Sequence, residues 1–267
     1  MKTGIGDEDI MKARVEGWVG RAASRAGLTI SRSATLHNRL PVEATKIDRV
    51  TIDAVRPFTM TSSERIWSLL KAVDYIVDQP IPGDFVECGV WRGGSVMAMA
   101  HRLQERGQTD RNLWLYDTYE GMTPPTQEDI EATTGATAQQ LLEATDIADG
   151  NNVWCVADLD DVTANITSTG YPLDHVTFVK GDVAVTLHEQ APESIALLRL
   201  DTDWYESTRV GLELLYPRLA LGGVCILDHY GHWQGARKAV DDYFDQQGFR
   251  PLMHPIDFSG RIFLKTR

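Results

Sequence analysis

Apolar segments that end in polar residues alternate with helical segments along most of this chain. This pattern is typical of a parallel sheet covered by helices on both faces, because each strand is then buried on both sides. The predicted strands span residues 84–90, 113–118, 176–180, 195–201 and 223–228. The predicted helices span 62–78, 94–106, 162–169, 208–219 and 235–247, and a hairpin is expected over 251–265. We therefore predict an α/β fold, in which ligands bind at the carboxyl ends of the strands.

An N-terminal arm is predicted to precede this domain. Residues 1–58 contain a possible amphipathic helix over 9–26 and an irregular segment over 29–57. Such an arm has too few apolar residues to form a core of its own, so we expect it to pack on the main domain, residues 59–267, or on a partner subunit. A homodimer is the expected assembly.

A polar segment at residues 121–145 interrupts the alternation and begins close to Pro124 and Pro125. We predict that it is a lid that carries a short helix, closes over the site and excludes water. The alternative is a surface loop without a catalytic role.

Composition restricts the classes of partner. The 267 residues carry a net charge of -12, which disfavours non-specific binding to nucleic acid or to anionic membranes. No run of about 18 apolar residues occurs, and the N-terminus lacks the apolar stretch of a signal peptide. We predict a cytoplasmic protein that binds neither nucleic acid nor membranes.

The segment from Glu87 to Ser95 combines a strand end with a glycine-containing turn and a helix start. Gly89 and the glycines that follow allow the backbone to approach a ligand, and the N–H groups of the helix start can bind an anion. The spacing does not match the G-x-G-x-x-G pattern of dinucleotide-binding proteins, which disfavours a dehydrogenase. A tight turn without a ligand is the alternative.

Two further carboxylates follow predicted strands. Asp117 ends the strand after the glycine turn, where a carboxylate can accept hydrogen bonds from both ribose hydroxyls of a nucleoside. Asp182 could accept a hydrogen bond from an adenine amino group, or it could cap the turn that follows.

The most informative segment follows the strand at 195–201. Asp201 and Asp203 alternate just after the apolar run 195–198, and Asp228 and His229 end the next strand. If these strands are neighbours, the four side chains converge in one crevice. Clustered carboxylates repel one another without a cation, and hard cations such as Mg²⁺ prefer oxygen ligands. The alternative is that one carboxylate caps a helix and another faces solvent.

With these residues in view, the chain resembles the macrocin O-methyltransferase family, whose members methylate sugar hydroxyls. The resemblance covers roughly residues 59–244. It is based on Thr59-Met60 with Arg65, the run Glu87 to Gly94, Asp117 with Glu120-Gly121, the run Leu198 to Thr208, Gly222-Gly223 and the run Asp228 to Gly231.

The resemblance implies a Rossmann-like class I methyltransferase fold with a mostly parallel, seven-stranded sheet, and S-adenosylmethionine as the methyl donor. It implies that the turn containing Glu87, Gly89 and Ser95 holds the donor. Asp117 would bind the ribose of the donor and Asp182 would lie near its adenine. Met60 would cover the donor.

The resemblance also implies Mg²⁺ dependence, with Asp201 and Asp228 as metal ligands and Asp203 as the general base. The family usually has two adjacent aspartates where this chain has Asp228-His229. Three roles of His229 are compatible with this departure: it binds a softer ion such as Mn²⁺, it gives way to a water ligand, or it acts as the base itself. Metal identity and the choice of base between Asp203 and His229 stay open at this point.

The predicted function is metal-dependent methyl transfer to a sugar hydroxyl of a small-molecule or oligosaccharide acceptor. Two alternatives remain: a catechol-type methyltransferase that acts on an aromatic diol, and a non-catalytic module that binds a nucleotide or metabolite. The second alternative leaves the group of Asp201, Asp203 and Asp228 unexplained.

Overall fold

The computed structural model describes residues 40–147 and 153–267. Residues 41–267 form a compact unit. The helix predicted over 9–26 lies outside the described residues, as does most of the arm, so the homodimer that we expected from the arm stays a prediction. Within the described part of the chain, no helix is long and apolar enough to cross a membrane.

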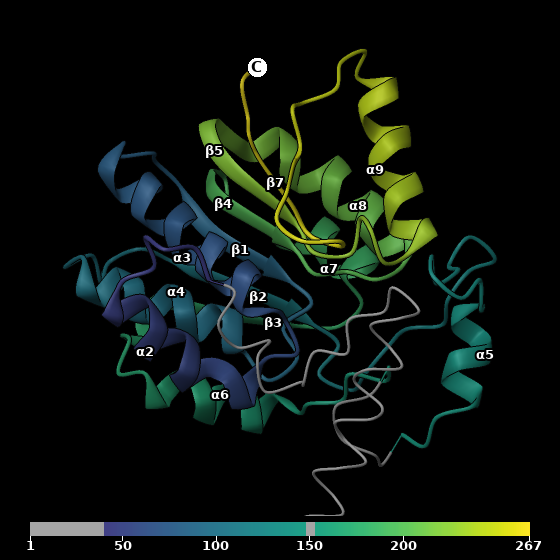
Figure 1. Ribbon diagram of the computed structural model, residues 1–267, viewed down its shortest axis with the longest axis horizontal. Helices are drawn as coiled ribbons and strands as arrows, with labels where there is room; N and C mark the ends of the chain where they lie inside the picture. Colours follow the sequence, from purple (N-terminus) through teal and green to yellow (C-terminus); the bar gives the residue numbers. More distant parts are fainter. Residues whose placement is uncertain (1–39, 148–152) are drawn as a thin grey trace, which may run out of the picture. The chain divides into compact units, whose positions relative to one another are not determined.

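The compact unit contains a seven-stranded sheet with the order β3-β2-β1-β4-β5-β7-β6 (Figure 1). Strands β1 to β5 are parallel, β7 is antiparallel to β5, and β6 is antiparallel to β7. The prediction of a mostly parallel sheet closed by a C-terminal hairpin is confirmed. The strands are β1 (Asp84–Cys88), β2 (Leu113–Asp117), β3 (Val176–Lys180), β4 (Ile195–Leu200), β5 (Leu219–Leu227), β6 (His254–Pro255) and β7 (Arg261–Leu264).

Helices cover both faces of the sheet. The described helices are α2 (Lys46–Val55), α3 (Ser63–Asp78), α4 (Gly94–Glu105), α5 (Ala138–Glu143), α6 (Leu159–Ser168), α7 (Val183–Glu189), α8 (Tyr205–Leu215) and α9 (Gln234–Gln246), of which α5 lies in the segment predicted as a lid, apart from the sheet (Figure 1). Helices α2, α3, α4 and α6 contact one another, and α7, α8 and α9 form a second group. Figure 1 shows the two groups on opposite sides of the sheet.

The 3₁₀ turns complete the connections between these elements. They are η2 (Arg56–Phe58), η3 (Leu173–His175) and η4 (Tyr216–Arg218).

The central strand β4 shows why continuous apolar runs predicted this fold. All six of its residues are buried. Leu198 and Leu200 belong to the same buried cluster as Leu212 of α8 and Phe244 of α9. Burial of a leucine side chain contributes about 1.5–3 kcal/mol. A strand with apolar side chains on both faces gains this contribution in full only where helices cover both faces of the sheet.

Helix α2 is a difference from the sequence-based expectation. The segment 29–57 was predicted to be irregular, but residues 46–55 are helical. Its buried face combines the apolar Ile52 and Val55 with two polar residues. Ile47 and Val50 are exposed, so the apolar positions do not mark the buried face. A capping box at Thr45 and Asp48 starts the helix.

Asp48 is a fully buried carboxylate that connects α2 to its neighbours. Its Oδ2 accepts hydrogen bonds from the Thr45 backbone N–H at 2.9 Å and from Trp67 Nε1 at 3.3 Å. Arg102 pairs with the other oxygen, and Lys71 Nζ lies 3.5 Å from Oδ2. Burial alone raises the pKa of Asp48, but the Thr45 N–H, Arg102 and Lys71 together lower it from 3.8 to about 2.

We expect Asp48→Asn to lower the free energy of unfolding by roughly 2–3 kcal/mol at pH 7, since the shift of about two pKa units is lost with the charge. A depressed pKa stabilises the fold above the unfolded-state value near 3.8. The difference between wild type and variant should therefore be constant above about pH 5 and shrink as the pH falls towards 2.

Urea denaturation at pH 7, 5 and 3 measures this difference. Asp53→Asn, at an exposed position of the same helix, is the matched control and should change stability by less than about 0.5 kcal/mol. A difference that does not depend on pH would contradict the ionic explanation.

Candidate active site

Backbone hydrogen bonds place the polar residues after β1, β2, β4 and β5 side by side. Cys88, Leu200 and Leu227 are aligned in the sheet register. Just beyond them, the Asp201 N–H donates to the Cys88 carbonyl at 2.8 Å, and the Asp228 N–H donates to the Leu200 carbonyl at 3.0 Å. The convergence predicted for Asp201 and Asp228 follows from this register.

The turn after β1 adopts a conformation that requires glycine at its first position. Gly89 has φ +83°, and a Cβ atom there would lie 2.3 Å from the Asp201 carbonyl oxygen. Asp117 holds the turn, because its Oδ2 accepts the backbone N–H groups of Val90 at 2.6 Å and Trp91 at 3.0 Å. The carboxylate that we predicted to bind a ribose therefore also has a structural role.

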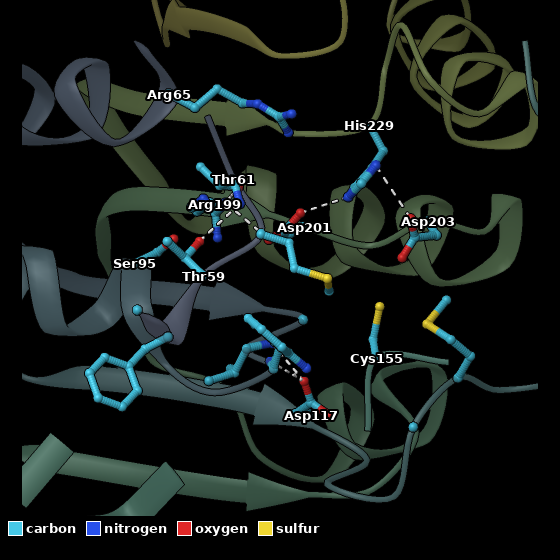
Figure 2. A pocket seen from close by; sticks show the side chains of 18 residues that line it. Thr59, Thr61, Arg65, Ser95, Asp117, Cys155, Arg199, Asp201, Asp203 and His229 are labelled. Carbon is cyan, nitrogen blue, oxygen red and sulfur yellow. Dashed lines mark hydrogen bonds and ion pairs between the residues drawn. The ribbon is translucent and has the colours of Figure 1, made fainter. Parts of the chain in front are cut away.

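A cavity of about 150 Å³ opens in front of this turn. Figure 2 shows Asp117 on one side and Asp201, Asp203 and His229 on another, with Thr59 and Thr61 nearby. The lining residues are Phe58, Thr59, Met60, Thr61, Arg65, Gly89, Val90, Trp91, Gly94, Ser95, Asp117, Gly121, Met122, Cys155, Arg199, Asp201, Asp203 and His229. Four of the residues predicted to bind the donor, Met60, Gly89, Ser95 and Asp117, thus meet in one cavity.

Asp182 lies in a second cavity that shares lining residues with the first. This cavity, of about 70 Å³, is also lined by Gly89, Asp117 and Asp203. Asp182 is the N-cap of α7, where its Oδ1 accepts the Ala184 N–H at 2.9 Å. Asp182 therefore caps the helix. Its predicted contact with adenine stays a proposal.

Glu87 and Asp228 line neither of these two cavities but lie behind the first one, paired with Arg199. Arg199, which is 2% exposed, forms ion pairs with Glu87, Asp228 and Asp201, the last at 2.9 Å. Burial raises the pKa of Glu87 to about 8, although Arg199 opposes this shift. Asp228 also accepts hydrogen bonds from Arg65 Nη1 at 3.1 Å and from the Thr61 hydroxyl at 3.0 Å.

His229 lies between two carboxylates that face the cavity. Its Nε2 is 2.8 Å from Asp201 Oδ1. Its Nδ1 is 3.3 Å from Asp203 Oδ1, an ion-pair distance without hydrogen-bond geometry. Burial lowers the pKa of His229, but Asp203 and Asp201 outweigh it and raise the pKa to about 9. The imidazole is therefore charged near neutral pH in this arrangement.

Asp203 has a different environment from Asp201. Burial raises the pKa of Asp203 above its ordinary value, against the opposing charge of His229. The indole Nε1 of Trp233 donates a hydrogen bond to Asp203 Oδ1 at 2.7 Å. By contrast, Arg199 and His229 outweigh the effect of burial and lower the pKa of Asp201. The two neighbouring aspartates thus differ in basicity.

The three predicted metal ligands do not form a three-residue site in this arrangement. Asp201 and His229 face the cavity, whereas Asp228 Oδ2 is already bonded to Arg65, Arg199 and Thr61. Asp228 Oδ1 is buried without a hydrogen-bond partner. Among residues 40–147 and 153–267, no group of three His, Cys, Asp or Glu side chains is placed to hold a metal ion.

The predicted lid contacts both sides of the site through one segment, residues 122–137, which we call the strap. Trp204 Nε1 donates to the Thr123 carbonyl at 2.9 Å, and Asp129 Oδ1 accepts the Tyr205 N–H at 2.7 Å. The Ala132 N–H donates to the His232 carbonyl at 2.8 Å. Closure of this segment stays a prediction.

Comparison with known proteins shows which family the chain belongs to. Residues 29–265 match the family described as Macrocin-O-methyltransferase (TylF). The chain belongs to this family. It is therefore an O-methyltransferase, and its sheet and helices have the arrangement of class I, S-adenosylmethionine-dependent methyltransferases. The match extends further towards the N-terminus than the resemblance that we recognised from motifs.

Two curated relatives of the chain come from Streptomyces species. The 8-demethyl-8-(2,3-dimethoxy-alpha-L-rhamnosyl)-tetracenomycin-C 4'-O-methyltransferase of Streptomyces olivaceus is 36% identical over 78% of this chain and 76% of the relative. The demethyldecarbamoylnovobiocin O-methyltransferase of Streptomyces niveus is 31% identical, again over 78% of this chain and 76% of the relative.

Two solved structures support the fold. The O-methyltransferase NovP superposes with a TM-score of 0.68 at 28% identity, over 79% of this chain and 83% of NovP. The calicheamicin methyltransferase CalS11 has a TM-score of 0.57 at 17% identity, over 86% of this chain and 89% of CalS11. The second likeness concerns the fold alone.

Sequence reasoning missed the role of two residues in the site. Arg199 is a charged residue within the apolar run of β4, a pattern that predicts a buried ion pair. Trp233 was not among the predicted site residues, because no sequence signal connects its N–H to Asp203 across 30 residues.

We expect Gly89→Ala to lower the free energy of unfolding by roughly 2–5 kcal/mol, because the new methyl group meets the Asp201 carbonyl and the positive φ is strained. Binding of S-adenosylhomocysteine should weaken about tenfold or more, because β1 and β4 must separate. Denaturation and calorimetric titration measure the two effects.

Gly107→Ala is the matched control for the backbone strain. Gly107 has φ +68° and no heavy atom within 4 Å of the added Cβ. It should lose only about 1–2 kcal/mol and keep full affinity for S-adenosylhomocysteine. Equal losses in the two variants would show that the collision with Asp201 is unimportant.

Proposed function

We propose that this O-methyltransferase transfers the methyl group of S-adenosylmethionine to a hydroxyl group of a sugar, carried by a small glycosylated acceptor. The observation that carries the proposal is the single cavity that joins the glycine turn and Asp117 to Asp201, Asp203 and His229. The names of the curated relatives support a sugar acceptor, since one of them is a mycinamicin III 3''-O-methyltransferase of Micromonospora griseorubida, 31% identical over 76% of both chains.

The donor would bind along the turn after β1. Each carboxylate oxygen has two lone pairs, so Asp117 can hold the turn and still accept a hydrogen bond from a ribose hydroxyl. Ser95, in the first turn of α4, and Met60 would enclose the rest of the donor. Asp182, in the adjoining cavity, would lie near the adenine.

The chemical task of the protein is to remove the proton of the acceptor hydroxyl, and we assign this role to Asp203. As the acceptor oxygen forms its bond to the methyl carbon, the carbon–sulfur bond breaks and its electron pair stays on sulfur, so the hydroxyl proton must leave. Burial raises the pKa of Asp203, which makes it a stronger base than an ordinary carboxylate. His229, with a pKa of about 9, already holds its proton near neutral pH. Asp203 is therefore our choice for the base.

Mg²⁺ dependence stays a prediction. If an ion binds here, it would lower the pKa of a coordinated hydroxyl and orient the acceptor. Asp201 and His229 are the predicted ligands that face the cavity, and Mn²⁺ suits an imidazole ligand better than Mg²⁺ does. Without an ion, His229 and Arg199 supply the positive charge beside Asp201.

The central experiment incubates the protein with labelled S-adenosylmethionine and free or glycosidic sugars, in Mg²⁺, Mn²⁺ or EDTA. Label in a methoxy group of a sugar is the expected result. Loss of transfer in EDTA, with recovery on adding an ion, would establish metal dependence, whereas full transfer in EDTA would exclude it. Absence of transfer to every sugar, with transfer to a catechol, would contradict the proposed acceptor.

We expect Asp203→Asn to lower kcat by about 10²- to 10⁴-fold, because the amide cannot take the proton. Affinity for S-adenosylhomocysteine should change by less than about threefold, since the proposed donor contacts are elsewhere. Steady-state kinetics and calorimetry measure these quantities, with Asp53→Asn as a control remote from the site. Retention of wild-type kcat would exclude Asp203 as the base.

A further inference from the structure

The carboxylate of Asp203 is held by a donor from a different part of the chain. Trp233 Nε1 lies 2.7 Å from Asp203 Oδ1. An indole N–H donates a hydrogen bond but cannot accept one, so Asp203 is always the acceptor in this contact. The contact therefore orients the carboxylate. Trp233 is 3% exposed, so its indole ring is enclosed by the protein.

Packing and backbone hydrogen bonds fix Trp233 itself. Its ring meets Trp204 edge to face, with centroids 4.9 Å apart. The Gln234 N–H donates to the Ile130 carbonyl at 2.9 Å, and Glu131 forms an isolated antiparallel bridge with Trp233. The strap therefore holds the segment on both sides of the indole.

The same strap holds the segment that carries Asp203. Asp129, which is fully buried, caps the start of α8 by accepting the Tyr205 N–H two residues after Asp203. Trp204, the next residue after Asp203, donates its indole N–H to the Thr123 carbonyl. The carboxylate of Asp203 and the N–H of Trp233 are thus attached to one common segment.

We propose that Trp233 is a positioning residue for Asp203: its N–H fixes one carboxylate oxygen so that the carboxylate is aligned to take the proton of the acceptor hydroxyl. The strap maintains the relative placement of the two side chains. This inference rests on the proposed function, in which Asp203 is the base. A free carboxylate can rotate about its last bond, and misplacement of a reacting group by about 1 Å can cost 10²-fold in rate.

The test compares Trp233→Phe with Trp114→Phe. Both variants remove an indole N–H that donates to a carboxylate, but the first N–H reaches Asp203, whereas the second reaches Asp84 Oδ2 at 2.8 Å, at the start of β1 and remote from the site. We expect Trp233→Phe to lower kcat about 10- to 100-fold, with KM for the donor and the acceptor changed by less than about threefold. Trp114→Phe should retain kcat within about threefold.

A double variant separates positioning from general damage. In the Asp203→Asn background, Trp233→Phe should cause no further loss of kcat, because its effect acts through the missing carboxylate. An additional loss equal to that in the wild-type background would overturn the inference, as would an unchanged kcat in Trp233→Phe alone. Equal losses of kcat in Trp233→Phe and Trp114→Phe would also overturn it in favour of a general effect of losing an indole.

Separate controls test the folding of each variant and methyl transfer by the wild-type protein. The free energy of unfolding is measured for every variant, and if Trp233→Phe does not fold, benzothienylalanine at position 233 keeps the ring shape and replaces the N–H with sulfur. That replacement should give the same loss of kcat, and wild-type kcat with it would overturn the inference. A wild-type protein without any methyl transfer would overturn the proposed function and this inference together, whereas an active wild type with unaffected variants would overturn the inference alone.

Discussion

The buried guanidinium of Arg199 is the interaction on which the rest of the site depends. It lies in the middle strand of the sheet, where an unpaired charge would cost several kcal/mol. Its three partners, Glu87, Asp201 and Asp228, come from the ends of three adjacent strands. Arg199 therefore allows Asp201 and Asp228 to lie together with Glu87, whose pKa is raised by burial, and Arg65 and His229 add positive charge beside the two aspartates. Arg199 also fixes the oxygens of Asp201 beside the cavity.

Close backbone approach provides the second constraint. Gly89 lies so near the Asp201 carbonyl that no side chain can be accommodated, and the carboxylate of Asp117 gathers the N–H groups of the turn. These contacts bring the end of β1 against the ends of β2 and β4. The side of the cavity proposed for the donor and the side proposed for the acceptor are consequently built on one set of strand ends, as preorganised catalysis requires.

The strap adds a third level to this organisation. It contributes no titratable group to the main cavity, yet its carbonyls and the carboxylate of Asp129 hold both Trp204 and the segment around Trp233. A segment predicted as a lid is therefore also a scaffold for Asp203. Family membership explains the chemistry of methyl transfer, and these contacts explain how this chain would orient its base.

The sequence by itself determined the class of fold and the edge of the sheet where the predicted site residues meet. Apolar strands can be recognised locally, and the carboxyl ends of parallel strands always meet at one edge, so Asp117, Asp201 and Asp228 could be placed near one another from the sequence. Helix α2 was missed because only Ile52 and Val55 give it an apolar face.

Only the tertiary structure decided which atoms touch. It pairs Asp228 with two arginines behind the cavity, sets His229 between two carboxylates, and brings Trp233 to Asp203. These contacts join residues that are far apart in the chain or on different strands. The direction of each pKa shift follows from burial and from such neighbours, which no local pattern in the sequence specifies.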